Sequence, residues 1–210
     1  MSEPIRIAGL ISGGGRTLIN ILDQIDASKL NASVQLVIAS RGEIEGIKRA
    51  QERDLEVNII RKRDYDSEDQ MHDAITDALI AKQIDLVCLC GYLRWFRVDE
   101  QFQGRVINIH PALLPDFGGQ GMHGMSVHRA VIEANRRVSG CSVHFVDEHY
   151  DQGPVILQKA CPVLEHDTED TLAARVFKQE CIAYPEAINL YAASQLSIKD
   201  KRVVISPITK

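Results

Sequence analysis

Residues 106–115 read Val-Ile-Asn-Ile-His-Pro-Ala-Leu-Leu-Pro, an apolar run that ends in a carboxamide and an imidazole. On a strand, residues two apart point to the same face, so Asn108 and His110 are predicted to lie side by side where the strand ends. Further along, Asp151-Gln152-Gly153-Pro154 places a carboxylate on a tight turn. An amide donor, a titratable ring and a carboxylate together suit chemistry at a carbonyl carbon, where an oxyanion forms and a proton moves.

Short apolar runs alternate with helical patterns before this stretch. Strands are predicted at 5–11, 34–39, 57–60, 86–90 and 106–109, and helices at 17–25, 44–53 and 67–83. Such alternation predicts a doubly wound, mostly parallel sheet of Rossmann-like α/β type. Ligands of such sheets bind beyond the carboxyl ends of the strands, which here selects residues 12–17, 91–96 and those from Asn108 onward.

The pattern changes in the C-terminal half. Residues 142–146 and 155–163 are predicted to pair as antiparallel strands across the Asp151 turn. A long helix is predicted at 168–193, and Pro185 is expected to kink or split it. Residues 203–205 are predicted to form an edge strand. No repeat or linker interrupts the chain, so we expect one domain over residues 1–210.

Composition limits the partners of this chain. Its 210 residues are 45% hydrophobic and 25% charged, as in ordinary globular proteins. A net charge of −5 argues against non-specific nucleic-acid binding. We expect no signal peptide and no membrane span. The five cysteines include no C-x-x-C pair and are predicted to be reduced thiols of a cytoplasmic protein, and the histidines lack metal-ligand spacing, so no metal is expected.

Ser12-Gly13-Gly14-Gly15-Arg16-Thr17 follows the first predicted strand and opens the first helix. Glycines let the backbone approach an anion, and a helix N-terminus offers N–H groups. The loop lacks the Lys-Ser/Thr of a Walker A motif, and Leu18 stands where the dinucleotide fingerprint has glycine. A phosphate monoester fits best, with Arg16 as an additional positive charge. A tight turn without a ligand explains the spacing equally well.

Two other features each have a functional and a structural interpretation. Residues 91–96 either line a pocket for a flat ring or begin a helix that packs its own apolar side chains. Glu180 continues the apolar stripe of Leu172 and Val176, so it either meets a polar ligand or is wet because the helix rolls outward near Pro185.

The residues at the carbonyl-chemistry site have structural alternatives too. Asn108 as a turn residue would cap backbone groups, and Asp151 would close an Asx turn. His110 as a core histidine is disfavoured, because Pro111 and the turn at 113–115 place it at a strand end.

Taken together, these residues resemble the small folate-dependent phosphoribosylglycinamide formyltransferases of purine synthesis. The resemblance runs from residue 7 to about residue 192. The segments that carry it are N-I-H-P-A-L-L-P at 108–115, S-V-H-F-V at 142–146, D-Q-G-P-V-I-L-Q at 151–158, and residues 171–185 with Glu180 and Tyr184-Pro185.

The resemblance implies transfer of a formyl group from 10-formyltetrahydrofolate, a co-substrate, to the amine of glycinamide ribonucleotide. Asn108 and His110 would then stabilise the oxyanion, and Asp151 would position His110 and raise its pKa. The remaining implied contacts fall into two groups. The phosphoribosyl substrate would be held by Ser12, Gly13, Gly15, Arg16, Thr17 and Glu180. The folate would be held by Leu93, Arg94, Trp95, Phe96, Asn108 and the loop residues Asp147, Glu148, His149, Tyr150. The N-terminal half would bind phosphate, and the C-terminal half would bind folate and carry catalysis.

Three departures from the family pattern stand out. Arg16 and Thr17 replace the usual Ser-Asn of the phosphate loop. Residues 118–124, GGQGMHG, are longer than the usual connection and suggest a mobile flap or lid. A basic residue that many members use near the folate tail falls at Glu68, and Arg61, Lys62 or Arg63 are the candidates to replace it.

Other functions remain open from sequence. A 10-formyltetrahydrofolate hydrolase or a formyltransferase with another amine acceptor fits the same motifs. A non-catalytic folate or nucleotide sensor is a second alternative, although a sensor has no need for Asn108, His110 and Asp151 together. The expected partners are small molecules, with a monomer or homodimer as the assembly.

Overall fold

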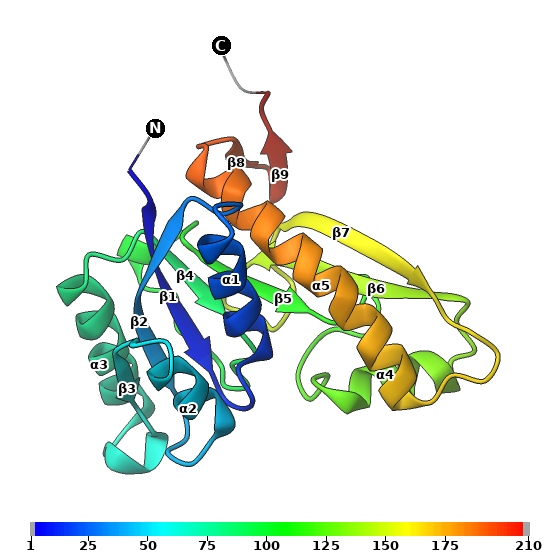
Figure 1. Ribbon diagram of the computed structural model, residues 1–210, viewed down its shortest axis with the longest axis horizontal. Coiled ribbons are helices and arrows are strands. Elements are labelled where there is room, and N and C mark those ends of the chain that lie inside the picture. The colour runs from blue at the N-terminus through cyan, green and yellow to red at the C-terminus, as the bar shows by residue number, and fades with distance from the viewer. Residues whose placement is uncertain (1–2, 208–210) are drawn as a thin grey trace. The chain divides into compact units, whose positions relative to one another are not determined.

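The structure is a computed structural model that describes residues 3–207. The chain falls into two compact units, the first ending at Ile107 and the second beginning at Asn108. A mostly parallel seven-stranded sheet has the strand order β3-β2-β1-β4-β5-β6-β7, and a separate two-stranded sheet pairs β8 with β9 (Figure 1). The predicted α/β class with an antiparallel C-terminal strand pair and a long C-terminal helix is confirmed.

The first unit is built from parallel strands with helices between them, as the alternating pattern predicts. Its strands β1 to β4 are hydrogen-bonded in the order β3-β2-β1-β4. The strands are β1 (Ile5–Ile11), β2 (Ala32–Ala39), β3 (Val57–Ile59) and β4 (Leu86–Leu89), and the helices are α1 (Arg16–Asp26), α2 (Glu45–Gln51) and α3 (Glu68–Ala81), with short 3-10 turns at Lys62–Asp64 and Glu100–Phe102. Each predicted strand and helix of this unit is confirmed, with ends that differ by a few residues.

Backbone proximity explains how α1 packs on β1. Gly9 lies in the middle of β1, and a Cβ there would lie 2.8 Å from Leu18 Cδ1 of α1. The missing side chain lets Leu18, which is fully buried, pack directly on the strand. Gly13 to Gly15 connect β1 to α1, so this contact between the strand and the helix also positions the loop that joins them.

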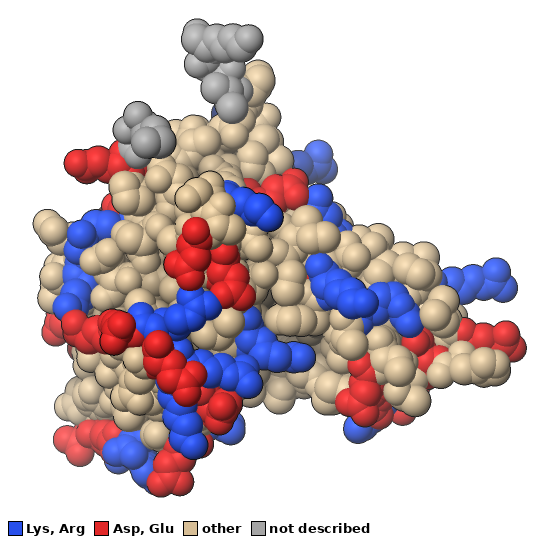
Figure 2. Space-filling model, in the orientation of Figure 1, with Lys and Arg blue, Asp and Glu red and all other residues tan. Residues whose placement is uncertain are grey.

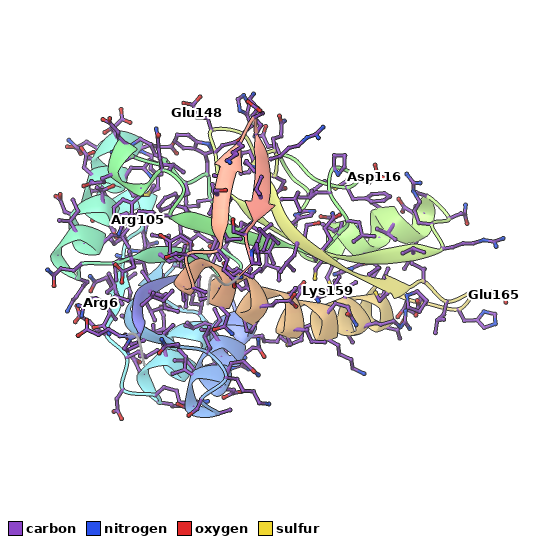
Figure 3. The ribbon with its side chains drawn as sticks, turned by 90° about the horizontal axis from the view of Figure 1, so that it is seen from above. Arg6, Arg105, Asp116, Glu148, Lys159 and Glu165 are labelled. Carbon is purple, nitrogen blue, oxygen red and sulfur yellow. The ribbon has the colours of Figure 1, made fainter. Side chains whose placement is uncertain are left out.

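Two arginines bind the loop that leads into β4, at the amino ends of the parallel strands (Figure 3). Arg6 Nη2 donates to the carbonyl of Lys82 at 2.8 Å, and Arg105 Nε donates to the carbonyl of Asp85 at 2.9 Å. Both arginines therefore satisfy backbone carbonyls of the loop between α3 and β4. The candidate site residues of this unit lie at the other ends of the strands, in the loops that follow their carboxyl ends.

The second unit contains antiparallel strands covered by a long helix. β6 and β7 pair antiparallel, and α5 packs on both of them (Figure 1). Its elements are β5 (Val106–His110, shared with the first unit), α4 (Met125–Glu133), β6 (Val138–Phe145), β7 (Val155–Pro162), α5 (Glu169–Ala192), β8 (Leu196–Lys199) and β9 (Arg202–Ile205). Lys159 of β7 (labelled in Figure 3) pairs with Glu186 of α5 at 2.7 Å.

One of the two outcomes expected for Pro185 in the C-terminal half is wrong. Pro185 does not split the long helix, which runs unbroken from Glu169 to Ala192. Pro185 is buried together with Tyr184 and Ile188, so packing against the strands outweighs the hydrogen bond that proline removes. The edge strand predicted at 203–205 is confirmed as β9, which pairs with β8 in the separate two-stranded sheet, where each strand is an edge.

The surface carries charges of both signs. On the face shown in Figure 2, Lys and Arg side chains are interspersed with Asp and Glu, without one extended patch of a single sign. Among the described residues, no helix is long and apolar enough to cross a membrane.

The N-terminus of α5 offers a test of what holds this helix in place. Thr168 Oγ1 accepts a hydrogen bond from Thr171 N, and Thr168 N donates to Thr171 Oγ1. Thr168→Ala is expected to lower the free energy of unfolding by about 1 kcal/mol, because the helix loses its capping hydroxyl. Thr168→Ser, which keeps the hydroxyl, is the control. Equal stability of both variants in denaturant titrations would show that the cap contributes nothing.

Candidate functional site

Asn108 and His110 lie on β5, and their side chains gather around Asp151 as the sequence predicts. Asn108 Nδ2 donates to Asp151 Oδ1 at 3.4 Å, and His110 Nδ1 lies 3.4 Å from Asp151 Oδ2. The side chains of His110 and Asp151 are only 4% and 10% exposed. The amide, the imidazole and the carboxylate therefore form one largely buried cluster within the second unit.

The hydrogen bonds of His110 define its neutral tautomer. Its Nε2 lies 2.8 Å from the carbonyl oxygen of Phe117, which can only accept, so Nε2 carries a proton. In the neutral ring, Nδ1 then presents a lone pair toward the Asp151 carboxylate. Protonation of Nδ1 converts this contact into a charged hydrogen bond. The surroundings thus provide an acceptor for each nitrogen of an imidazolium.

The pKa of His110 is lower than that of a free histidine, although a neighbouring carboxylate is expected to raise it. Burial lowers it, and the charge of Asp151 and the Phe117 carbonyl act in the opposite direction without restoring the ordinary value. Asp151 raises the pKa of His110, as expected. The pKa nevertheless lies below that of a free histidine, because burial lowers it by more. For Asp151, burial favours a higher pKa. The nearby ring of His144, the charge of His110 and the Gly119 N–H outweigh it and hold the pKa below its usual value.

The Asp151 carboxylate is not used to close its own turn. Asp151 Oδ2 accepts from Gly119 N at 3.0 Å, and its backbone is left-handed, with φ of 57°. Aspartate adopts this conformation more readily than most residues, which lets the turn aim the carboxylate inward. The Asx-turn alternative for Asp151 is therefore wrong. Asn108, which lies within β5, is likewise not a turn residue.

Sequence reasoning missed two buried histidines near this cluster. His144 of β6 donates from Nδ1 to the Phe145 carbonyl at 2.8 Å, and its Nε2 accepts from Asn108 Nδ2 at 3.2 Å. His128 of α4 is buried, and the charge of His110 contributes to lowering its pKa after the larger effect of burial. The period-two alternation of Ser142, His144 and Val146 is the signal that would have placed His144 on one face of its strand.

A cavity of about 440 Å³ lies beside the carboxylate of Asp151. Its walls combine apolar side chains of Leu114, Pro115 and Val155 with polar groups of Tyr150 and Gln152. A concave site with apolar walls and a few polar groups is typical of small-molecule binding. The cavity belongs to the second unit and is formed in part by the loop that precedes Asp151.

The loop at 147–150 is well exposed. His149 N donates to Asp147 Oδ1 at 2.8 Å, and Tyr150 lines the cavity with 38% of its surface exposed. Of the four predicted folate contacts in this loop, the structure places only Tyr150 at the cavity. The positions of Asp147, Glu148 and His149 as ligand contacts stay predictions.

The segment at 118–124 was expected to form a flap. Gly118 and Gly119 approach Asp151 closely: a Cβ at Gly118 would lie 3.2 Å from Asp151 Cβ, and Gly119 supplies the N–H described above. The beginning of this segment therefore supports the carboxylate. Its function as a lid stays a prediction.

Glu180 lies on α5, four residues after the buried Val176. Its charge, after the larger effect of burial, helps to raise the pKa of Cys141 in β6 to about 12, so Glu180 faces the sheet side of the helix. The helix does not roll outward near Pro185, because Ala183 to Pro185 are buried. The alternative of a fully wet Glu180 is therefore wrong, since the residue is half-buried.

In the first unit, the loop from Ser12 to Thr17 joins the ends of three strands. Ser12 Oγ lies 2.6 Å from Ser40 Oγ after β2 and accepts from Leu93 N after β4 at 2.9 Å. Gly15 begins α1 with φ of 70°, and no side chain caps this helix in the described chain. The N–H groups of the first turn are thus presented without a side-chain acceptor, which suits an anion.

Gly46 is a second residue that sequence reasoning missed. Its N–H donates to the Gly13 carbonyl at 3.1 Å, and a Cβ at Gly46 would lie 2.6 Å from that oxygen. A Cβ at Gly15 would lie 2.9 Å from Gly46 Cα. Arg49 Nη1 also donates to the Gly14 carbonyl at 3.0 Å. The start of α2 therefore holds the loop by direct backbone contact.

Residues 91–96 form no helix, so the helix-start alternative for this segment is wrong. Phe96 is 4% exposed and packs at an angle to Tyr92 and His72. Trp95 also contacts His72, with ring centroids 5.2 Å apart, and is partly exposed. Leu93, Arg94 and Trp95 thus have surface available to a ligand, whereas Phe96 is buried against Tyr92 and His72.

The sequence is similar to that of known formyltransferases. The sequence model of the formyl transferase family matches residues 5–188. A chloroplastic phosphoribosylglycinamide formyltransferase of Vigna unguiculata is 36% identical over 87% of this chain and 59% of its own length. The phosphoribosylglycinamide formyltransferase of Haemophilus influenzae is 32% identical over 93% and 91%, respectively.

A solved structure is similar over almost the whole chain. The glycinamide ribonucleotide transformylase 1 of Symbiobacterium toebii has a TM-score of 0.91 and 38% identity, and the alignment covers 99% of this chain and 96% of that one. This chain thus spans 59% of the Vigna protein and nearly all of the two bacterial relatives.

The contact between Gly46 and the loop gives a stability prediction. Gly46→Ala is expected to lower the free energy of unfolding by about 1–3 kcal/mol, because its Cβ overlaps the Gly13 carbonyl. Gly13→Ala is the matched control, since no atom lies within 4 Å of a Cβ there. Chemical denaturation of both variants measures the difference. A Gly46→Ala protein as stable as Gly13→Ala would contradict the close approach.

Proposed function

Because the chain belongs to the formyl transferase family, we propose that it transfers the formyl group of 10-formyltetrahydrofolate to the amine of 5-phosphoribosylglycinamide. The products are formylglycinamide ribonucleotide and tetrahydrofolate, in purine biosynthesis. The observation that carries this proposal is the cluster of Asn108, His110 and Asp151 beside a cavity. The names of the relatives supply the acceptor.

Catalysis is assigned to this cluster. The substrate amine forms a bond to the formyl carbon, the bond from that carbon to the folate nitrogen breaks, and a proton passes from the amine to that nitrogen. The Asn108 amide donates to the oxygen on which negative charge develops, and the positive charge of protonated His110 stabilises that oxygen. His110 holds the proton that moves, and Asp151 orients the ring and stabilises its charged form.

The phosphoribosyl substrate is assigned to the first-unit loop and to Glu180. N–H groups from Gly15 to Thr17 open α1 and bind the phosphate, with Ser12 and Gly13 shaping the turn. Arg16 and Thr17 replace the family's usual side chains, but the backbone donors do not depend on side-chain identity. Glu180 is assigned to the ribose and amine region as a hydrogen-bond acceptor.

The folate co-substrate is assigned to apolar and aromatic surface. Leu93, Arg94 and Trp95 contact its ring system, with Phe96 supporting them, and the loop from Asp147 to Tyr150 adds further contacts. The mixed apolar and polar wall of the cavity beside Asp151 fits a flat heterocycle with polar edges. When bound, the co-substrate supplies an activated formyl group. No metal is assigned a role in this chemistry.

The wider assignments are part of the same proposal. Both units act together as one formyltransferase domain over residues 1–210, as a monomer or homodimer that takes small-molecule substrates without nucleic-acid or membrane partners. Within residues 3–207, the buried cysteines 88, 90, 141 and 161 are thiols and not disulfides, which supports a cytoplasmic location. Two alternatives remain: a hydrolase or a transferase with another amine acceptor, and a sensor without turnover.

The first experiment mixes purified protein with 10-formyltetrahydrofolate and 5-phosphoribosylglycinamide and assays both products. Amine-dependent formation of the formylated product is expected, and His110→Ala is expected to lose roughly 10²–10⁴-fold in turnover. A blank without the amine tests the hydrolase, because tetrahydrofolate release there identifies hydrolysis. Folate binding without turnover would favour the sensor and contradict the proposal.

Asp151→Asn separates charge from shape at this cluster. The negative charge of Asp151 acts to raise the pKa of His110, so its removal lowers that pKa further. The charged ring is then populated only at lower pH, and the limb of the pH–rate profile that reports His110 is expected to move to lower pH while kcat falls. Circular dichroism of the variant controls for folding. An unshifted limb with wild-type kcat would remove Asp151 from the mechanism.

A further inference from the structure

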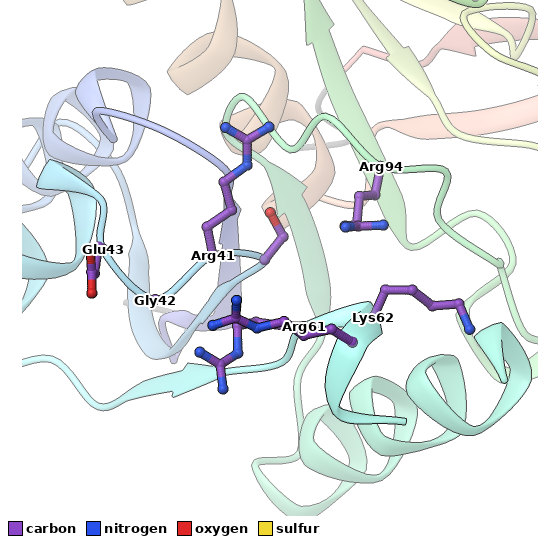
Figure 4. A pocket seen from close by; sticks show the side chains of 8 residues that line it. Arg41, Gly42, Glu43, Arg61, Lys62 and Arg94 are labelled. Atoms are coloured by element: carbon purple, nitrogen blue, oxygen red, sulfur yellow. The ribbon is translucent and has the colours of Figure 1, made fainter. Parts of the chain in front are cut away.

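The segment at 91–99 contains the side chains assigned to the folate ring, yet this stretch, which the structure describes throughout, forms no helix or strand. Near its beginning, Leu93 N donates to Ser12 Oγ at 2.9 Å. Arg94 extends from the segment into a basic pocket of about 450 Å³ (Figure 4). Because no ladder of backbone hydrogen bonds fixes such a segment, its side chains keep their places only where other contacts hold them.

One face of α3 supplies these contacts in the first unit. Asp69, His72, Asp73 and Thr76 have the spacing i, i+3, i+4 and i+7, so they lie on the same side of the helix. All four contact the segment, His72 through its ring and the others through hydrogen bonds. The segment is therefore attached to a rigid element along two turns of helix.

Arg97 makes the polar part of this attachment. Its Nη2 donates to Asp73 Oδ1 at 2.5 Å, its Nη1 to Asp69 Oδ1 at 3.3 Å, and its Nε to Asp99 Oδ1 at 2.9 Å. Thr76 Oγ1 also donates to Asp99. Single exposed ion pairs contribute little, but the Arg97 side chain is only 26% exposed and joins three carboxylates in one network. Its planar fork fixes direction as well as distance.

His72 makes the apolar part of the attachment. It is 2% exposed, and its ring stands at 89° to that of Trp95 with the centroids 5.2 Å apart. Burial lowers its pKa and the charge of Arg97 lowers it further, against the effect of nearby carboxylates, so the ring is mostly neutral near pH 7. Within residues 3–207, its Nδ1 has no hydrogen-bond partner. Packing against Trp95 and Phe96, not a hydrogen bond of Nδ1, accounts for this ring.

We propose that Arg97 and His72 are positioning residues for the folate co-substrate: Arg97 fixes the course of the segment, and His72 sets the orientation of the Trp95 ring. The inference rests on the proposed function, which assigns Leu93, Arg94 and Trp95 to the folate ring system. Neither positioning residue touches the reacting atoms. A surface that is ordered before the ligand arrives loses less conformational entropy on binding, so both residues act on the affinity for folate.

The fluorescence of Trp95, the only tryptophan of the chain, tests this geometry without a ligand. Acrylamide is expected to quench Arg97→Gln about twofold more strongly than the wild type, because the segment loses its attachment to α3. Arg97→Lys keeps the charge without the fork and is expected to fall between them. The matched control is Arg53→Gln, since Arg53 is 34% exposed and pairs with Asp23 and Asp26 of α1 in the same unit. Its quenching is expected to equal that of the wild type.

Steady-state kinetics separate positioning from catalysis. In Arg97→Gln and His72→Ala, the KM for 10-formyltetrahydrofolate is expected to rise about tenfold, while the KM for 5-phosphoribosylglycinamide and kcat stay within about twofold of the wild type. His72→Phe keeps an aromatic ring against Trp95 and is expected to restore most of the affinity. Calorimetry with tetrahydrofolate measures the same loss of affinity without turnover.

Unchanged fluorescence and unchanged tetrahydrofolate affinity in Arg97→Gln and His72→Ala would overturn the inference. Changes of the same size in Arg53→Gln would overturn it as well, because the loss of any ion pair in the first unit would then explain them. Weaker tetrahydrofolate binding in the two variants, in a protein whose wild type shows no turnover, would support the positioning role and contradict the proposed function. The two proposals can therefore fail separately.

Discussion

Burial of one carboxylate, that of Asp151, organises the polar residues of the second unit. A carboxylate removed from water is stabilised only when donors and positive charge surround it. Here two donors come from separate parts of the chain, the Asn108 amide from β5 and the Gly119 N–H from the following loop, and the titratable rings of His110 and His144 lie beside the carboxylate. Each element must lie where it does for Asp151 to remain charged, so the site and the local fold have the same physical requirement.

A different constraint, close approach of backbone to backbone, shapes the first unit. Gly15 and Gly46 lie so near each other that a Cβ on either would overlap neighbouring atoms, and Gly9 gives Leu18 direct access to β1. These contacts hold the loop rigidly without using side chains at its tip. The loop can therefore exchange side chains, as at Arg16 and Thr17, while its N–H groups keep their positions.

The sequence was a good guide wherever one local pattern decides the structure. Alternating apolar runs predicted the strands and helices of the first unit, and the spacing of Asn108 and His110 predicted their common face. It failed where distant packing decides. Pro185 lies inside an unbroken helix because the strands bury it. His144 and Gly46 owe their importance to partners that are far away in the sequence and that no local period reveals.

The net pKa of His110 illustrates the same limit in electrostatic terms. Burial and the Asp151 charge act in opposite directions, and only the three-dimensional depth of the ring shows that burial prevails. The result is a ring that is neutral more readily than a free histidine, yet faces acceptors at both nitrogens. A proton that reaches Nδ1 during a reaction gains a hydrogen bond that the resting ring lacks. The arrangement therefore favours the charged ring most when a developing oxyanion adds to the negative charge of Asp151, which is when the proton is needed.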